Sequence, residues 1–238
     1  MQHPDFDFIA VHDSHHQPFR GWGSINVDES YPHDPEKYAH KQRYARMLPH
    51  LFFRDYEYSV YLDPKWELTP EFIELCAEQV RRKKSWLVPP HPNRENLVQE
   101  FLFPFLNGAL SLQECKKAID YLASINTDFS RFFPSLTGWL IRQHNQTNRQ
   151  IGERWFDLLL NCYENNVRDQ IVFPFAVHDK SLVDQSISMG QLHNCGVKLN
   201  YPGQTRVHKV DWESQINDLI RYLQEKTGIR TKLYVKPE

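Results

Sequence analysis

The sequence predicts a single α/β domain in which helices flank a mostly parallel central sheet. Short apolar runs typical of strands alternate with amphipathic stretches typical of helices, and this alternation favours a sheet covered by helices. The length of 238 residues suits one domain. The chain has no internal repeat and no convincing linker. We therefore expect residues 1–238 to form one unit, with a basic tail at 228–238.

Composition narrows the classes of protein to consider. Hydrophobic residues make up 40% of the chain and charged residues 24%, so a sizeable core is expected. The net charge of −2 argues against a nucleic-acid binder. No apolar run approaches the ~18–20 residues of a membrane span, and the polar N-terminus does not resemble a signal peptide. The four cysteines have no zinc-ligand spacing and are expected to be reduced, which fits a cytoplasmic protein.

The first elements expected along the chain are a strand, a loop, a helix and a second strand. Residues 6–11 form a short apolar run typical of a strand, and 15–35 form a loop rich in Gly, Pro, His and Asp. A helix at 35–48 begins with a proline, which suits the first helical position, and ends before Pro49. The apolar, β-prone run at 58–62 predicts the second strand.

The middle of the chain predicts three helices and a strand. Thr69 is a good N-cap for a helix at 70–80, which carries an apolar stripe at helical spacing. A short strand at 86–88 is closed by two prolines. Apolar periodicity predicts the helix at 94–106, and a capping box predicts the start of the helix at 112–122.

The last third begins with a strand at 138–141. Helices at 151–163 and 168–177 follow. The segment 186–209 is irregular, either a lid over a binding site or an ordinary long loop. A final helix, 212–223, has apolar residues along one side and an aspartate as its cap.

Asp63 is the first candidate functional residue, because it directly follows a predicted strand. Ligands of open α/β sheets bind beyond the carboxyl ends of the strands. A carboxylate there can bind Mg²⁺ or Mn²⁺, which prefer oxygen ligands. The competing interpretation is an ordinary turn aspartate before Pro64.

Two further polar groups follow predicted strands. His91 and Arg94 come after the strand at 86–88, and Arg94 is suited to grip a phosphate, with Glu100 further along. Arg142 and His144 come after the strand at 138–141, where His144 is either a metal ligand, a proton carrier or a structural histidine. If the strands are parallel, both groups lie at the same edge as Asp63.

Arg168, Asp169 and Gln170 form a third polar group. Asp169 is either a helix cap or a general base in the cleft, with Arg168 beside it. The histidine-rich stretch at 12–16 has the composition of a metal site, but its adjacent residues do not have a ligand spacing. Phosphate-binding glycine motifs and a nucleophile elbow are absent from the sequence.

Taken in order, these segments resemble the glycosyltransferase-like family that includes plant mucilage pectin galacturonosyltransferases and many bacterial members. The resemblance covers roughly 38–180. It rests on the following motifs: a basic helix from Lys41 to Arg46, Leu48-Pro49-His50, Arg54-Asp55-Tyr56, Tyr61-Leu62-Asp63, His91-Pro92-Asn93-Arg94 with Glu100, Arg142-Gln143-His144-Asn145, Trp155 and Arg168-Asp169-Gln170.

The resemblance implies a GT-A type, Rossmann-like domain that transfers a hexose from a nucleotide sugar, most simply a UDP-sugar, to a glycan acceptor. Such an enzyme serves surface polysaccharide or lipopolysaccharide synthesis. It also implies a divalent metal (Mn²⁺ or Mg²⁺) at Asp63, with Arg94, Lys41 and Arg43 adding positive charge and Asp169 activating the acceptor. His144 or His178 is implied as a further metal or phosphate contact.

One departure from the family pattern concerns the metal. The family usually has glycine after the strand-end aspartate, where this chain has Pro64 and Lys65. Lys65 is therefore a candidate to supply part of the positive charge that a metal would bring. Two other functions stay open: a non-catalytic glycan-binding or partner-binding member of the same fold, and a metal-dependent hydrolase.

Overall fold

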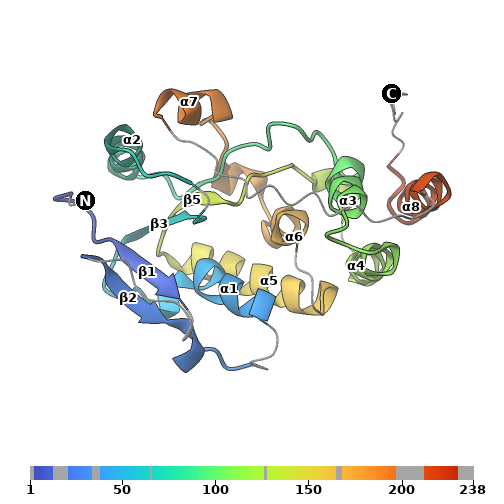
Figure 1. Cartoon of the computed structure of the whole chain (residues 1–238), viewed down its shortest axis with the longest axis horizontal. Helices are drawn as coiled ribbons and strands as arrows, with labels where there is room; N and C mark the ends of the chain where they lie inside the picture. Colours follow the sequence, from blue (N-terminus) through green and yellow to red (C-terminus); the bar gives the residue numbers. More distant parts are fainter. Residues whose placement is uncertain are drawn as a thin grey trace.

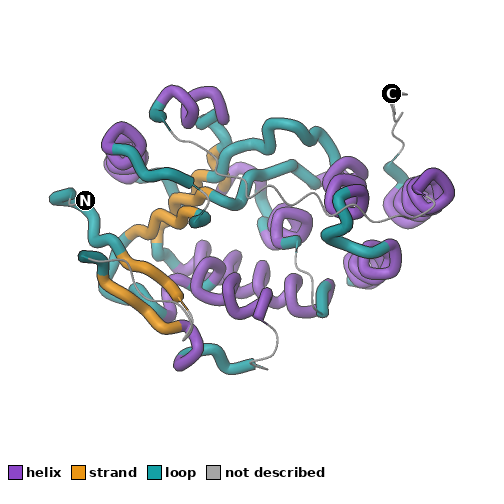
Figure 2. Tube along the Cα trace, in the orientation of Figure 1, coloured by secondary structure: helices purple, strands orange, loops and turns teal. Residues whose placement is uncertain are grey.

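The structure of the chain is a computed structural model that describes residues 3–12, 21–33, 38–64, 66–125, 128–164, 168–196 and 212–229. Over these residues it contains eight α-helices and two small sheets (Figures 1 and 2). The predicted α/β class is confirmed. Most of the predicted basic tail lies outside the described residues, as do Lys65 and most of the histidine-rich stretch.

The main sheet has four strands in the order β3-β5-β4-β6. Their bounds are Tyr58–Leu62 for β3, Trp86–Leu87 for β4, Trp139–Gln143 for β5 and Val183–Asp184 for β6. A separate sheet pairs β1 (Ile9–His12) with β2 (Gly23–Asn26) in parallel. Neither β2, which lies in the segment predicted to be a loop, nor β6 was predicted.

The prediction of a mostly parallel, Rossmann-like sheet of the GT-A type is wrong, since two of the three pairings in the main sheet are antiparallel. β5 runs opposite to β3 and β4, whereas β4 and β6 are parallel. The reason is the path between β4 and β5. The chain returns beside the point where β4 ended, with Leu136 N–H donating to the Pro89 carbonyl at 2.8 Å, and it then runs back through the sheet. A long helical connection therefore does not guarantee a parallel crossover.

Reversal of β5 alone leaves β3, β4 and β6 pointing in one direction. The edge at which these three strands end is called the carboxyl edge below. β5 begins at this edge, so residues just before β5 lie beside residues just after β3. Thus Asp63 N–H donates to the Gly138 carbonyl at 2.9 Å. Polar residues from several distant segments are brought together here.

The helices largely follow the predicted ranges. They are α1 (Tyr38–Met47), α2 (Pro70–Arg81), α3 (Leu97–Leu106), α4 (Leu112–Ser124), α5 (Gln146–Cys162), α6 (Asp169–Ala176), α7 (Met189–Asn194) and α8 (Trp212–Thr227). α5 begins five residues earlier than predicted because Asn145 caps it, its side chain accepting from Asn148 N–H. α7 falls in the segment predicted to be irregular.

Helices cover both faces of the main sheet (Figure 1). On one face Trp86 and Leu140 pack with residues of α1, α5 and α6, in a core that continues through α3, α4 and α8. On the other face Leu87 and Trp139 pack with α2 and α7. Neighbouring strand residues point to opposite faces, so each short strand contributes to both cores. None of the described helices has the length and apolar character needed to cross a bilayer.

Candidate functional site

A cluster of buried and half-buried charged side chains lies at the carboxyl edge. Its members come from α1, the end of β3, the segment leading into α3, α3 itself, and the start of α6. We call it the charged cluster; it consists of Arg43, Arg46, Asp63, Arg94, Glu100, Arg168 and Asp169. All seven belong to segments that carry the sequence motifs described above.

Arg46 lies at the centre of the charged cluster and joins its two aspartates. Its Nη1 is 3.6 Å from Asp63 Oδ1, and its Nη2 forms an ion pair with Asp169 Oδ2. Nη2 also donates to Thr137 Oγ1 at 2.7 Å, and Thr137 in turn donates to Asp169 Oδ2 at 2.6 Å. The Arg46 side chain is only 4% exposed. Residues far apart in the sequence are thus locked into one arrangement.

Aromatic rings hold this arrangement in place. The Arg46 guanidinium lies 4.9 Å from the centroid of the Tyr61 ring and 5.4 Å from that of Trp155, as expected for cation–π contacts. Trp155 Nε1 donates to the Asp169 carbonyl at 3.0 Å and so fixes the first residue of α6. Burial raises the pKa of Tyr61 to about 12, so its hydroxyl keeps its proton and donates to Asp63 Oδ1 at 2.6 Å.

The two aspartates differ in accessibility. The Asp169 side chain is 8% exposed, and both of its oxygens face cations or a hydroxyl group: Oδ2 faces Arg46 and Thr137, and Oδ1 is 3.7 Å from Arg43 Nε. The Asp63 side chain is 21% exposed. Glycine at position 138 makes room for it, because a Cβ there would lie 2.8 Å from Asp63 Oδ2. Asp63 is therefore the more accessible carboxylate.

The second half of the charged cluster surrounds Glu100. Arg94 Nη1 lies 3.4 Å from Glu100 Oε1 and also contacts the ring of His91. Burial raises the pKa of Glu100 to about 7, against the opposing effect of Arg94 and Arg168. Burial lowers the pKa of Arg168, and the like charges of Arg43 and Arg94 lower it further. Arg168 thus lies within electrostatic reach of both halves of the cluster.

The arginines of the charged cluster have unused hydrogen-bonding capacity. The Nε atoms of Arg43, Arg46, Arg94 and Arg168 are buried and have no hydrogen-bond partner among the described residues. Buried donors without partners are uncommon in folded proteins, and a bound anion is one way in which such groups are satisfied.

Two of the predicted site residues lie at other places because β5 is reversed. His144 follows β5, and its N–H donates to the carbonyl of Glu57, just before β3 begins. Glu57 precedes Asp63 by six residues, and at about 3.3 Å per strand residue this places His144 about 20 Å from Asp63. Burial lowers the pKa of His144, and its Nδ1 donates to the Phe53 carbonyl at 3.1 Å. Arg142 donates to the Arg46 carbonyl and so supports the end of α1. The expectation that both lie at the same edge as Asp63 is wrong.

Lys41 faces away from the arginines of its own helix. At 100° per residue, Arg43 and Arg46 lie about 60° apart around α1, whereas Lys41 lies about 140° from Arg46. Its Nζ pairs with Asp28 Oδ1 at 2.6 Å. Gln170, in contrast, lies at the carboxyl edge, where its amide donates to the Ser135 carbonyl at 3.2 Å.

The donor groups do not fit the divalent metal that the family resemblance implies. Asp63 is already paired with the Arg46 guanidinium and accepts from Tyr61. His178 is exposed and lies just beyond the C-terminal end of α6, whereas Asp169 begins that helix. At a rise of 1.5 Å per residue, the eight residues of α6 separate the two by more than about 10 Å. Among the described residues, no three His, Cys, Asp or Glu side chains converge in a way that would bind a metal.

Arg46 and Thr137 are the members of this site that sequence reasoning missed. A signal for Arg46 existed, since Arg43 and Arg46 are three residues apart on a helix and must share a face. No sequence signal points to Thr137, which reaches Asp169 only because β5 is reversed.

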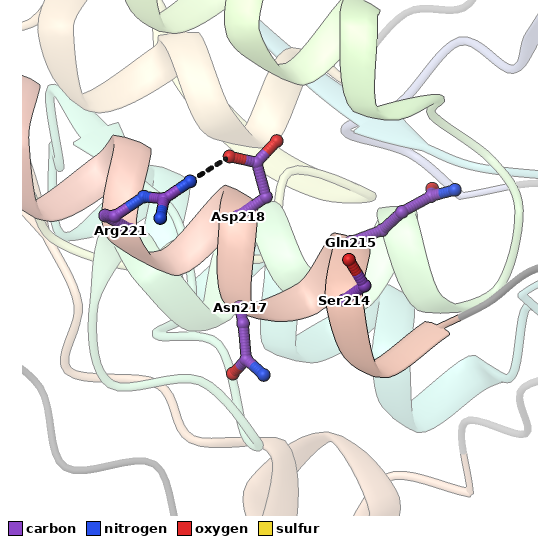
Figure 3. A pocket seen from close by; sticks show the side chains of 5 residues that line it. All are labelled: Ser214, Gln215, Asn217, Asp218 and Arg221. Atoms are coloured by element: carbon purple, nitrogen blue, oxygen red, sulfur yellow. Dashed lines mark hydrogen bonds and ion pairs between the residues drawn. The ribbon is translucent and has the colours of Figure 1, made fainter.

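A surface hollow on α8 is a separate feature (Figure 3). It is lined by Ser214, Gln215, Asn217, Asp218 and Arg221, with Arg221 paired to Asp218 at 3.0 Å. All five residues come from one helix, whereas the charged cluster joins five segments. The charged cluster is therefore the better candidate for a binding site.

Comparison with protein-family models, with curated proteins and with solved structures finds no match for this chain.

Proposed function

We propose that this chain is a nucleotide-sugar-dependent glycosyltransferase, which transfers a hexose to a glycan acceptor in surface polysaccharide synthesis. One observation carries the proposal. Asp63, Arg94 and Asp169, which come from three separate motifs of the family resemblance, belong to one charged cluster at the carboxyl edge. Ionisable side chains in perturbed environments are concentrated at functional sites.

The location of the charged cluster also supports the proposal. Ligands of open α/β sheets bind beyond the carboxyl ends of the strands. Here β3, β4 and β6 end at the same edge, and the charged cluster lies there. The arginines of the cluster are suited to a phosphorylated ligand, because a guanidinium matches the geometry of phosphate oxygens.

The proposed reaction is a displacement at the anomeric carbon of the donor sugar. An acceptor hydroxyl oxygen forms a bond to that carbon while the bond from the carbon to the diphosphate oxygen breaks. The bonding electrons leave with the diphosphate, whose charge the arginines balance. The hydroxyl proton passes to a carboxylate. Both aspartates contact Arg46, but the Asp63 side chain is 21% exposed. We assign the role to Asp63 because Asp169 is only 8% exposed and is also enclosed by Arg43 and Thr137.

Asp169 and Arg168 then have supporting roles. Asp169 keeps Arg46 and Arg43 in place, and Arg168 contributes positive charge beside Arg43 and Arg94. This arrangement differs from the expectation that Asp169 itself activates the acceptor.

The experiment compares Asp63→Asn with the wild-type protein. Asparagine keeps the shape of the side chain but cannot accept the proton, so turnover or donor hydrolysis with a panel of nucleotide sugars should fall ~10²–10⁴-fold. Asp157→Asn is the matched control, since Asp157 is exposed on α5 and accepts a hydrogen bond from Asn161, one turn further along the same helix. Equal activity of Asp63→Asn and the wild type would remove Asp63 from the mechanism.

A non-catalytic binding protein with this fold is the second candidate. The enclosure of Asp169 favours it, because a carboxylate held by cations is a weak base. Specific binding of a nucleotide sugar with neither transfer nor hydrolysis would support this candidate over the enzyme.

A further inference from the structure

We infer that the charged cluster binds the diphosphate of its ligand through arginine side chains and without a divalent metal. This inference rests on the proposed function for the identity of the ligand, but the phosphate site itself is tested separately below.

The first argument is the balance of charge. The charged cluster contains four guanidinium groups, those of Arg43, Arg46, Arg94 and Arg168, against three carboxylates. One carboxylate, Glu100, is buried and holds its proton more readily than usual, since its pKa is raised to about 7. The cluster is therefore positive at neutral pH. A diphosphate would be attracted to it, whereas a divalent cation would be repelled.

The second argument is the occupation of Asp63. In a metal-dependent site this carboxylate would be the ligand of the ion. Here the Arg46 guanidinium lies 3.6 Å from it and is itself only 4% exposed, held by Asp169 and Thr137. A metal ion at Asp63 would have to displace a buried arginine from three partners.

The third argument identifies which arginines remain for a ligand. Arg46 is used within the protein. Arg43 is 23% exposed, and its Nε lies 3.7 Å from Asp169, which is too far for a hydrogen bond. The Arg94 side chain is 9% exposed and contacts Glu100, whereas Arg168 is half-buried. Each has an Nε without a hydrogen-bond partner among the described residues. Arg43 and Arg94 both lie close enough to Arg168 for their charges to lower its pKa. Forked guanidinium donors of this kind are suited to the several oxygens of a diphosphate.

The experiment measures binding by titration calorimetry with two probes, inorganic pyrophosphate and UDP, each in EDTA and again with Mn²⁺. We expect both probes to bind in EDTA, with an affinity that Mn²⁺ changes by less than about threefold. Arg43→Gln and Arg168→Gln should each weaken pyrophosphate about tenfold or more in EDTA, because each removes a charge-assisted contact. Arg221→Gln, which removes an exposed arginine of α8, should have no effect.

The outcomes separate this inference from the proposed function. Pyrophosphate binding in EDTA with no binding of UDP or other nucleoside diphosphates would support the arginine site and contradict the glycosyltransferase. Nucleotide binding that requires Mn²⁺ and is lost in Asp63→Asn would overturn the arginine site and leave the glycosyltransferase standing. Absence of pyrophosphate binding by the wild-type protein in EDTA would also overturn it, and this result does not depend on how well any variant folds.

Discussion

Replacement of Arg46 by methionine should destabilise the protein strongly. Methionine is similar in length to the buried part of arginine and suits an aromatic environment between Tyr61 and Trp155. The substitution removes the cation that neutralises Asp169 and Asp63, while both carboxylates stay at the carboxyl edge.

The magnitude follows from burial. Removing one partner of a buried ion pair costs about 3–5 kcal/mol, because a charge is left uncompensated. For a chain of this size, each 1 kcal/mol shifts Tm by about 2–4 °C, so Arg46→Met should lower Tm by about 6–20 °C. Arg82→Met is the control. Its guanidinium is 58% exposed and pairs with Glu78, and such surface pairs contribute ~0.2–1 kcal/mol.

Differential scanning calorimetry of these variants gives the comparison. The double variant Arg46→Met/Asp169→Asn should recover part of the lost Tm, because the most buried carboxylate is then neutral. A Tm for Arg46→Met within about 4 °C of the wild type, similar to that of Arg82→Met, would refute the role of Arg46 as the central cation.

Three other predictions concern stability and reactivity. Gly152→Ala should lower Tm by several degrees or abolish folding, because its Cβ would lie 2.3 Å from the Met47 carbonyl oxygen; an unchanged Tm would contradict this close approach of α5 to α1. The folded-state pKa of Glu100 is raised to about 7, so wild-type stability should fall as pH rises from about 4.5 through 7. Glu100→Gln has no carboxyl charge to bury, so its free energy of unfolding, measured by urea titration, should not fall over this pH range. A pH profile parallel to that of the wild type would contradict this role of Glu100. A thiol reagent should label only Cys195 in the native protein, since the other three cysteines are buried, and fast labelling of a second one would contradict their burial.

Several elements were predictable from the sequence because their signals are local. Thr69 caps α2 through Phe72 N–H, and Ser111 and Glu114 form a capping box at α4. The apolar, β-prone run at 58–62 predicted β3 with both ends correct. The prediction of free cysteines is also confirmed. In each case the atoms that define the element belong to residues only a few positions apart.

The direction of β5 was not predictable in this way. It depends on where the chain re-enters the sheet after α3 and α4, and the contact that fixes this point is between Leu136 and Pro89, which are far apart in sequence. The same limit applies to the site. Asp63 and Asp169 were each recognised as candidates, but Arg46, which joins them, acts through tertiary contacts. His144 was placed at the wrong edge for the same reason.

A crystal structure of the protein with UDP tests the central claim most directly. The account predicts the diphosphate at the carboxyl edge, with its oxygens within hydrogen-bond distance of Arg43 and Arg168 and with Asp63 facing the position of the donor sugar. A nucleotide bound elsewhere, or a diphosphate that contacts none of the arginines of the charged cluster, would contradict it.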